Sequence, residues 1–260
     1  MIYLKTEPEI RLIREGGQKL SDILARLVAT VKPGVTTDQL DVLAERLMSE
    51  AGGEPAFKGY RSGGGSKPFP SAICASINGE VVHGPAVPGR ALKNGDILKL
   101  DVGLRYHDLY TDMAVTVGVG DISKEARRLV EATKEALLIG LDKVRDGAWI
   151  SDIGRVVDKY VRRQGFSTVK DLVGHGVGKY VHEEPQIPNY LDRSLEPVLI
   201  ETGMVLALEP MVNAGDDAVR VLPDGWTVVT ADGSLSAHFE ATVAVTGKGP
   251  EIMTPLLDNV

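Results

Sequence analysis

The feature that most constrains this chain is an internal repeat that covers most of its length. Pro33-Gly34 and Asp146-Gly147 each end one helical pattern and precede another. Aligning Gly34 with Gly147 without gaps also aligns Gly52 with Gly165. A repeat of about half the chain predicts two similar halves within a single domain, 1–260, rather than a solenoid. We place these halves at approximately 6–120 and 121–250.

Each half is predicted to begin with two helices. The first runs from Thr6 to about residue 30, because Thr6 and Glu9 have capping-box spacing and Pro8 lies in the first turn. The second starts at Thr36 or Thr37 and ends at glycines 52–53. The corresponding helices of the second half span 123–143 and 151–164. The second helices of the two halves share five aligned apolar positions: Leu40, Leu43, Ala44, Leu47 and Met48, and Ile153, Val156, Val157, Tyr160 and Val161.

Strand patterns follow the helices of the first half. Residues 73–82 read as one strand, and 98–117 read as a hairpin with a polar break at 105–108. Folding the hairpin between Tyr106 and His107 places Asp101 directly opposite Asp112. Opposed residues on one face have Cβ atoms about 4.5–5.5 Å apart. Two carboxylates that close repel each other unless one is protonated or a cation lies between them.

The repeat continues into these polar positions. Residues 95–101, ending in Asp101, match residues 203–209, ending in Glu209, and the segment after Asp112 matches the segment after Glu240. Val82-His83-Gly84 is similar to Gly174-His175-Gly176. Packing about a pseudo-two-fold axis would therefore bring four carboxylates together. We expect an α/β (α+β) fold of two βα halves about this axis.

Four buried carboxylates need compensation, because buried ionised groups otherwise take up protons or bind metal. Two divalent cations balance four carboxylates in formal charge, and a two-metal centre can activate water for hydrolysis. An imidazole among the oxygen ligands favours Co, Mn, Fe or Zn over Ca or Mg. The chain lacks the Gly-Lys-Ser/Thr and Gly-x-Gly-x-x-Gly motifs of nucleotide-binding loops. It also lacks the His-Glu-x-x-His motif of zincin-type proteases.

Composition limits the partners and the compartment. The net charge of −7 argues against a nucleic-acid partner. Cys74 is the single cysteine, so neither an intramolecular disulfide nor a cysteine zinc module is possible, as expected in a reducing compartment. The charged N-terminus is unlike a secretory signal, and no apolar run is long enough to span a bilayer. We expect a cytoplasmic protein without membrane contact.

The ordered set Asp101, Asp112, His175, Glu209 and Glu240 resembles that of the type I methionine aminopeptidases. The resemblance implies the pita-bread fold, in which helices cover a curved antiparallel sheet that holds the metals. The supporting segments are GHGVGKYVHEEP (174–185), LEPMVNAG (208–215) and DGWTVVTADGSLSAHFE (224–240). The resemblance covers essentially the whole chain. It implies a metal-dependent aminopeptidase that removes the initiator methionine from peptides with a small second residue. The implied enzyme is a monomer that acts on peptide or nascent-chain N-termini, with ribosome contact left open.

The resemblance also implies residue roles. Asp101 chelates one metal, His175 and Glu209 complete the shell of the other, and Asp112 and Glu240 bridge the two. Glu209 is in addition a candidate proton acceptor for the attacking water. His83 and His182 hydrogen-bond the substrate and the developing oxyanion.

The same resemblance implies the lining of a methionine pocket by Tyr60, Phe69, Cys74 and Trp226. Val181, beside His182, replaces the aromatic residue usual in the family. The Gly/Ser loop 61–67 is longer than in the common bacterial pattern. Both differences bear on the pocket. Asn78 and Ser236 match positions near a monovalent cation.

Other interpretations remain open at this stage. His107 is expected to be an exposed turn residue and His238 a structural one, although His238 shares the strand of Glu240. A proline-specific peptidase of the same fold is one alternative function. A binding protein that has lost catalysis is another, although such proteins lose ligands and this chain keeps all five.

Overall fold

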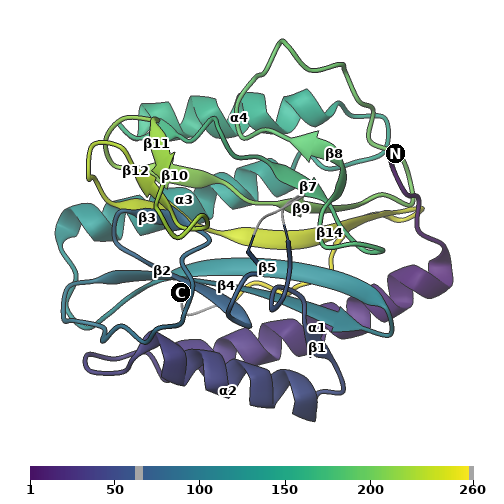
Figure 1. Ribbon diagram of the computed structural model, residues 1–260. Helices are drawn as coiled ribbons and strands as arrows, with labels where there is room; N and C mark the ends of the chain where they lie inside the picture. Colours follow the sequence, from purple (N-terminus) through teal and green to yellow (C-terminus); the bar gives the residue numbers. More distant parts are fainter. Residues whose placement is uncertain (62–66, 258–260) are drawn as a thin grey trace.

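Two pairs of helices enclose a strongly curved antiparallel sheet (Figure 1). The structure is a computed structural model that describes residues 1–61 and 67–257. Residues 62–66 of the predicted Gly/Ser loop lie outside the described residues. The N-terminal segment lies beside the second half of the chain, since Ile2 forms a parallel bridge with Glu184. The prediction of a curved antiparallel sheet covered by helices is confirmed.

The two halves of the repeat contribute elements in a similar order. The first half contains α1 (Glu7–Val28), α2 (Thr37–Glu50), β1 (Glu54–Pro55), β2 (Ile73–Ile77), β3 (Glu80–Val82), β4 (Ile97–Tyr106) and β5 (Leu109–Gly118). The second half contains α3 (Lys124–Leu141), α4 (Ile150–Arg163), β6 (Ser167–Thr168), β7 (Gly174–Gly176), β8 (Glu183–Ile187), β9 (Val205–Leu208), β10 (Met211–Asn213), β11 (Val219–Val221), β12 (Val228–Thr230), β13 (Ser236–His238), β14 (Glu240–Thr246) and β15 (Gly249–Ile252).

The large sheet is symmetric about its centre. Its strands run in the order β1-β4-β5-β14-β9-β7-β8, with β2 added beside β4 and β15 beside β14. The central β5–β14 pair therefore joins the two halves, and each half places its matching strand, β4 or β9, on the outer side of that pair. Three-stranded sheets β13-β10-β6 and β11-β12-β3 lie beside it.

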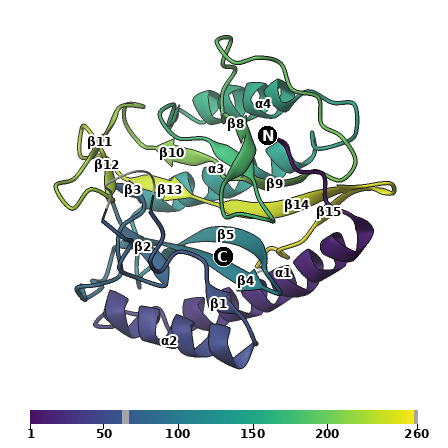
Figure 2. The ribbon, with the colours of Figure 1, turned by 45° about the vertical axis from the view of Figure 1, so that its right-hand side comes forward.

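The helix pairs cover opposite sides of the molecule. Helix α1 packs on the β4–β5 hairpin and α2 packs beside it against β1 and β2, whereas α3 and α4 pack mainly on strands of the second half (Figure 2). The start of α1 matches the prediction, because the Glu9 carboxylate accepts a 2.7 Å hydrogen bond from the backbone N–H of Thr6. Ser123 caps α3 by accepting from the backbone N–H of Ala126 at 3.0 Å. No helix in the described ranges is long and apolar enough to cross a membrane.

Alternation along the strands separates a core face from a second face. On β4, Leu98, Leu100, Val102 and Leu104 enter the hydrophobic core beneath the helices. Successive side chains of a strand point to opposite sides, so the residues between them lie on the other face. We call this second surface the site face. It carries the polar residues Lys99 and Asp101.

The hairpin register differs from the predicted one by two residues. The turn is centred on His107-Asp108, both with positive φ (49° and 62°), as a two-residue type I′ turn requires. Asp101 consequently pairs with Ala114, and Asp112 pairs with Gly103. The prediction that Asp101 and Asp112 are directly opposed was wrong, because it placed the turn one residue too early. His107 is exposed, as expected.

The predicted strand 73–82 is interrupted at its centre. Asn78 adopts a left-handed conformation (φ 53°), which ends β2 and reverses the chain into β3. Its side chain holds this turn against β4, since Nδ2 donates to Asp96 Oδ1 at 2.8 Å and Oδ1 accepts from the backbone N–H of Ile97 at 2.9 Å. Asparagine tolerates this conformation better than most residues do.

Candidate metal centre

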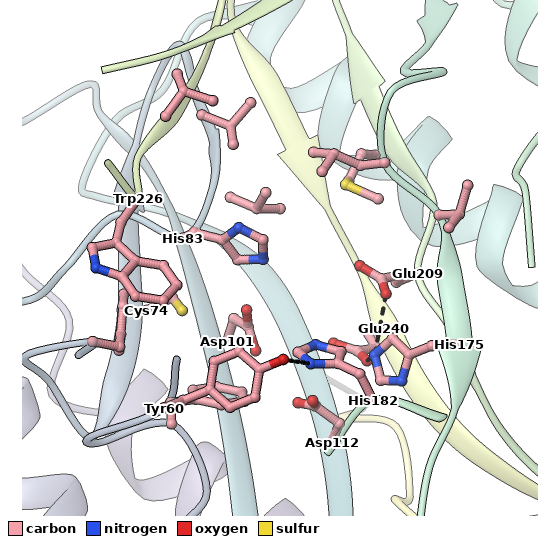
Figure 3. A pocket seen from close by; sticks show the side chains of 18 of the residues that line it. Tyr60, Cys74, His83, Asp101, Asp112, His175, His182, Glu209, Trp226 and Glu240 are labelled. Atoms are coloured by element: carbon pink, nitrogen blue, oxygen red, sulfur yellow. Dashed lines mark hydrogen bonds and ion pairs between the residues drawn. The ribbon is translucent and has the colours of Figure 1, made fainter. Parts of the chain in front are cut away.

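Four carboxylates and one histidine converge on the site face (Figure 3). Asp101 comes from β4, Asp112 from β5 and Glu240 from the first position of β14, whereas Glu209 follows β9 and His175 lies in β7. All five line one cavity of about 340 Å³. The structure therefore brings together every residue that the sequence predicted as a metal ligand.

Strand register explains why the carboxylates of both halves meet. Asp101 pairs with Ala114 on β5, and Ala114 in turn pairs with Glu240 on β14. Directly paired residues share a face, so the two carboxylates project to the same side with only a methyl group between them. Asp112 lies two residues before Ala114 and shares that face. Gly103 lies opposite Asp112, and its lack of a side chain lets Phe57 and Ala56 pack against the strand there.

The histidine approaches from the outer strand of the second half. His175 pairs with Ala207 on β9, and Ala207 pairs with Thr242 on β14, two residues beyond Glu240. The imidazole Nε2 lies 3.4 Å from Glu209 Oε1 and 4.0 Å from Glu240 Oε1. His175 thus faces the two carboxylates of its own half.

Several carboxylate oxygens of the cluster lack a hydrogen-bond partner, and this bears on whether the residues can bind a metal. Asp101 Oδ1, Asp112 Oδ1 and Glu240 Oε1 are buried without a hydrogen-bond partner among the described residues. Such groups are costly to bury unless they are paired or coordinate a metal. One ligand atom each of Asp112, His175 and Glu240 lie within 4.8 Å of one another. Carboxylate oxygens with an imidazole nitrogen form a donor set that fits a divalent transition metal.

Burial raises the pKa of each of the four carboxyl groups in the metal-free protein. The pKa of Asp101 rises to about 6 and that of Glu209 to about 8. The pKa values of Asp112 and Glu240 rise well above their usual range, because burial and then the neighbouring carboxylates disfavour ionisation. Without bound metal, the carboxyl groups of the cluster therefore retain protons, and metal binding must release these protons.

His83 and His182 lie on two sides of the cluster rather than within it. Burial lowers the pKa of His83 to about 4, so its imidazole is neutral near pH 7. His182 stands at the exposed mouth of the cavity, and partial burial lowers its pKa as well. Tyr60 hydroxyl oxygen lies 2.8 Å from His182 Nδ1, and the His182 and His175 rings are 4.5 Å apart at their centroids.

An apolar recess adjoins the carboxylates. Phe69 and Trp226 meet edge to face with centroids 5.2 Å apart, and buried Cys74 pairs with Asp101 across β2 and β4. Tyr60 packs against this group, as does Val181. All four residues predicted for a methionine pocket line the cavity. The structure adds others that no sequence signal singled out: Phe57, Val82, Leu172, Met211, Val221 and Val228.

His238 lies closer to the cluster than the sequence interpretation suggested. Its Nε2 is 3.6 Å from Glu209 Oε2, and both ring nitrogens are buried without a hydrogen-bond partner among the described residues. Burial lowers its pKa to about 4, so the ring is neutral. Its position two residues before Glu240 was the available signal.

No sequence pattern singled out Lys99 as a residue of the site. It is 1% exposed, and its Nζ donates to the backbone carbonyls of Asn78 at 2.6 Å and Ser236 at 2.9 Å. The two residues predicted to lie near a monovalent cation thus both contact this amine. Burial lowers the pKa of Lys99 to about 7, whereas the two carbonyl acceptors favour the protonated form.

The fold and the cluster define a class: metal-dependent peptidases built on a pita-bread scaffold. The family described as "Metallopeptidase family M24" matches residues 11–247. The chain is 46% identical to a methionine aminopeptidase of Clostridium perfringens over 98% of this chain and 99% of that one. It is 44% identical to methionine aminopeptidase 1 of Bacillus subtilis, again over 98% and 99% of the two chains. The chain therefore belongs to the methionine aminopeptidases of metallopeptidase family M24.

Solved structures agree with this assignment. The crystal structure of methionine aminopeptidase from Thermotoga maritima superposes with a TM-score of 0.92 at 39% identity and covers 98% of this chain and 100% of that one. An Xaa-Pro dipeptidase from Bacillus anthracis shares the fold at 21% identity with a TM-score of 0.77, and the match covers 63% of its length. The family resemblance predicted from the sequence is confirmed.

Proposed function

We propose that this chain removes the N-terminal methionine from peptides and nascent proteins whose second residue is small. The observation that carries the proposal is an apolar recess lined by Phe69, Cys74 and Trp226 that opens directly onto the carboxylate cluster. A thioether packs well against aromatic rings, so this recess suits a methionine side chain. The methionine aminopeptidases named above support the same activity.

The proposed cofactor is a pair of divalent ions, chosen from Co, Mn, Fe and Zn. Asp101, Asp112, His175, Glu209 and Glu240 would hold them. When bound, two such ions lower the pKa of a shared water and polarise the peptide carbonyl. The positive charge of the two ions also stabilises the ionised form of the carboxyl groups, which burial otherwise keeps protonated.

The chain's own residues divide the remaining tasks. Glu209 lies beside the proposed site of the attacking water, accepts its proton and can return it to the leaving amine. His83 and His182 reach the substrate from two sides and donate hydrogen bonds to the carbonyl oxygen as negative charge develops there. The Tyr60 hydroxyl at His182 Nδ1 fixes the orientation of that ring.

A proline-specific peptidase is the alternative on the same fold. The structural neighbours of that kind are 18–21% identical and share only the fold with this chain. Competing hydrolysis of Met-Ala-Ser and an Ala-Pro peptide separates the two activities. Exclusive cleavage of the Ala-Pro peptide would contradict our proposal.

The deciding experiment is release of free methionine from Met-Ala-Ser by metal-stripped protein titrated with Mn, Fe, Co and Zn. We expect activity with added metal and none in Asp112→Asn. Asp108→Asn is a matched control, because Asp108 lies exposed at the tip of the same hairpin. Folded protein without activity under any metal would favour a non-enzymatic binding protein.

We further propose a single catalytic domain, 1–260, that acts as a cytoplasmic monomer on peptide N-termini. The net charge of −7 gives no support for nucleic-acid binding. Gel filtration tests the monomer, limited proteolysis tests the single domain, and co-sedimentation tests ribosome contact.

A further inference from the structure

Lys99 is a buried lysine held by backbone carbonyls. Its side chain lies on the site face of β4, two residues before Asp101, and is 1% exposed. Within the described ranges, Lys99 Nζ forms no ion pair with a carboxylate and donates to the carbonyl oxygens of Asn78 and Ser236. A buried lysine normally needs a carboxylate partner, as Lys5 has in Glu183.

The carbonyl groups are fixed independently of the lysine. The left-handed Asn78 is anchored by its side chain to Asp96 and Ile97, as described above. The Asn78 carbonyl also accepts from the backbone N–H of Ser236 at 3.1 Å. The Ser236 hydroxyl in turn donates to the Val212 carbonyl at 3.2 Å. These bonds preform the frame that surrounds Lys99 Nζ.

The frame joins β4, which carries the candidate ligand Asp101, to the ends of two other strands. Asn78 ends β2, Lys99 belongs to β4 with Asp101, and Ser236 begins β13, which ends at His238. A second link runs parallel to it, since the Thr116 hydroxyl donates to the His238 carbonyl at 2.7 Å. The lysine therefore lies where the two halves meet, two residues before Asp101 on β4.

Backbone carbonyl oxygens are the groups that replace the hydration shell of an alkali ion in proteins. An ammonium group has the same charge and can satisfy several carbonyls with its three donors. We propose that the Lys99 ammonium is a tethered substitute for a monovalent cation: it fills the carbonyl frame of Asn78 and Ser236 and positions β4 and β13 around the metal centre. It would replace the free ion predicted near these residues.

The first test uses the unaltered protein and needs no peptide. We expect its melting temperature and its affinity for Mn to be the same in KCl, NaCl and choline chloride at equal ionic strength. A requirement for potassium or sodium would overturn the proposal, because it would show that a free ion is still needed. These readouts are independent of aminopeptidase activity, although the relevance of the metal centre rests on the proposed function.

The second test removes the ammonium. Lys99→Ala opens the frame, and we expect its Mn affinity by calorimetry to fall about 10–100-fold, as for loss of a group that supports metal ligands. Potassium or ammonium ions should restore most of that affinity and the melting temperature, whereas choline should not. Equal effects of all three salts, or none, would contradict the proposal.

Two further variants keep the test decisive. Lys99→Met fills the same volume without charge, so it should lose affinity and resist restoration by any salt. A Lys99→Met protein that matches the parent in Mn affinity and melting temperature would refute the proposal even if Lys99→Ala failed to fold. Thr116→Val is the matched control, since it weakens the same junction without opening a cation frame. Its defect should not respond to potassium.

Discussion

The two halves supply equivalent carboxylates by different routes. In the first half, one hairpin with a two-residue turn carries both Asp101 on β4 and Asp112 on β5. In the second half, the chain makes β10 to β13 between Glu209 and Glu240 before it returns beside β9. The symmetric order β4-β5-β14-β9 is nevertheless retained. The comparison teaches that register across the central strands, and not the length of the connection, places the ligands.

The inserted segment of the second half also explains the asymmetry of the site. It supplies Met211, Trp226 and Val228 to the wall of the cavity and places His238 beside Glu209. The first half has no counterpart between β4 and β5, because its turn contains only two residues. The inserted segment thus adds a second wall to a cavity whose other wall, with Tyr60, Phe69 and Cys74, comes from the first half.

The largest expected effect tests whether the equivalent residues Asp112 and Glu240 matter equally. Asp112→Asn and Glu240→Gln should each lower kcat/KM for Met-Ala-Ser by about 10³-fold or more, because a metal ion contributes several kcal/mol to the transition state. Metal content, measured by atomic emission, should fall in both. Retained metal and activity in one of the two would show that the halves are not equivalent at the cluster.

The second prediction compares His83 and His175, the two histidines of the His-Gly pairs that the repeat aligns. His175→Ala should lose metal, whereas His83→Ala should keep it and lose about 10²-fold in kcat, as for removal of one oxyanion donor. His182→Ala should behave like His83→Ala. Metal analysis and steady-state kinetics on the same preparations distinguish these outcomes. Loss of metal in His83→Ala would assign that residue to the ligand set instead.

The third effect is the pH dependence of stability in the metal-free protein. Burial raises the pKa of Asp101 to about 6 and that of Glu209 to about 8, so these two groups bind more protons in the folded state than in the unfolded state between about pH 4 and 8. Buried His83 and His238, whose pKa values are lowered to about 4, act in the opposite direction below about pH 6.5. The free energy of unfolding should therefore fall as pH rises from about 6.5 to 8, where the histidines no longer contribute. Urea titrations at pH 6.5 and pH 8 measure it.

Variants assign that pH dependence to the two halves. Asp101→Asn should remove mainly the part below about pH 6, and Glu209→Gln the part that extends to about pH 8. Saturating Mn should reduce the fall, since the metal replaces the protons. A metal-free protein that becomes more stable from pH 6.5 to pH 8 would contradict the raised pKa of Glu209.

The smallest effect concerns the first helix of the second half. Ser123→Ala removes the cap of α3 and should lower the free energy of unfolding by about 1 kcal/mol. Mn affinity should be unchanged, because α3 lies outside the cluster. Glu9→Ala at the start of α1 is the counterpart in the first half. A large change in Mn affinity in either variant would mean that helix ends and ligands are coupled.

Much of this fold was predictable from local patterns. The helix starts at Thr6 and Ser123 follow from capping residues, and the repeat follows from aligned glycines and apolar positions. The curved antiparallel sheet was implied by the family resemblance. The hairpin register was missed by two residues, because the type I′ turn uses His107-Asp108 in place of the Asn-Gly or Asp-Gly that usually marks one. The break at Asn78 was missed because β-type residues continue on both sides of it.

The four carboxylates of the cluster could be identified from the repeat, because it aligns them in matching motifs and their buried charges require compensation. The repeat offers His83 and His175 equally, and the family resemblance selects His175. What surrounds these residues depends on the three-dimensional packing. Lys99, Phe57 and His238 reach the site through pairings between strands far apart in the chain. Local periodicity can assign a residue to a face of its strand. The partner across that face depends on register and on the packing of the two halves, which no local pattern contains.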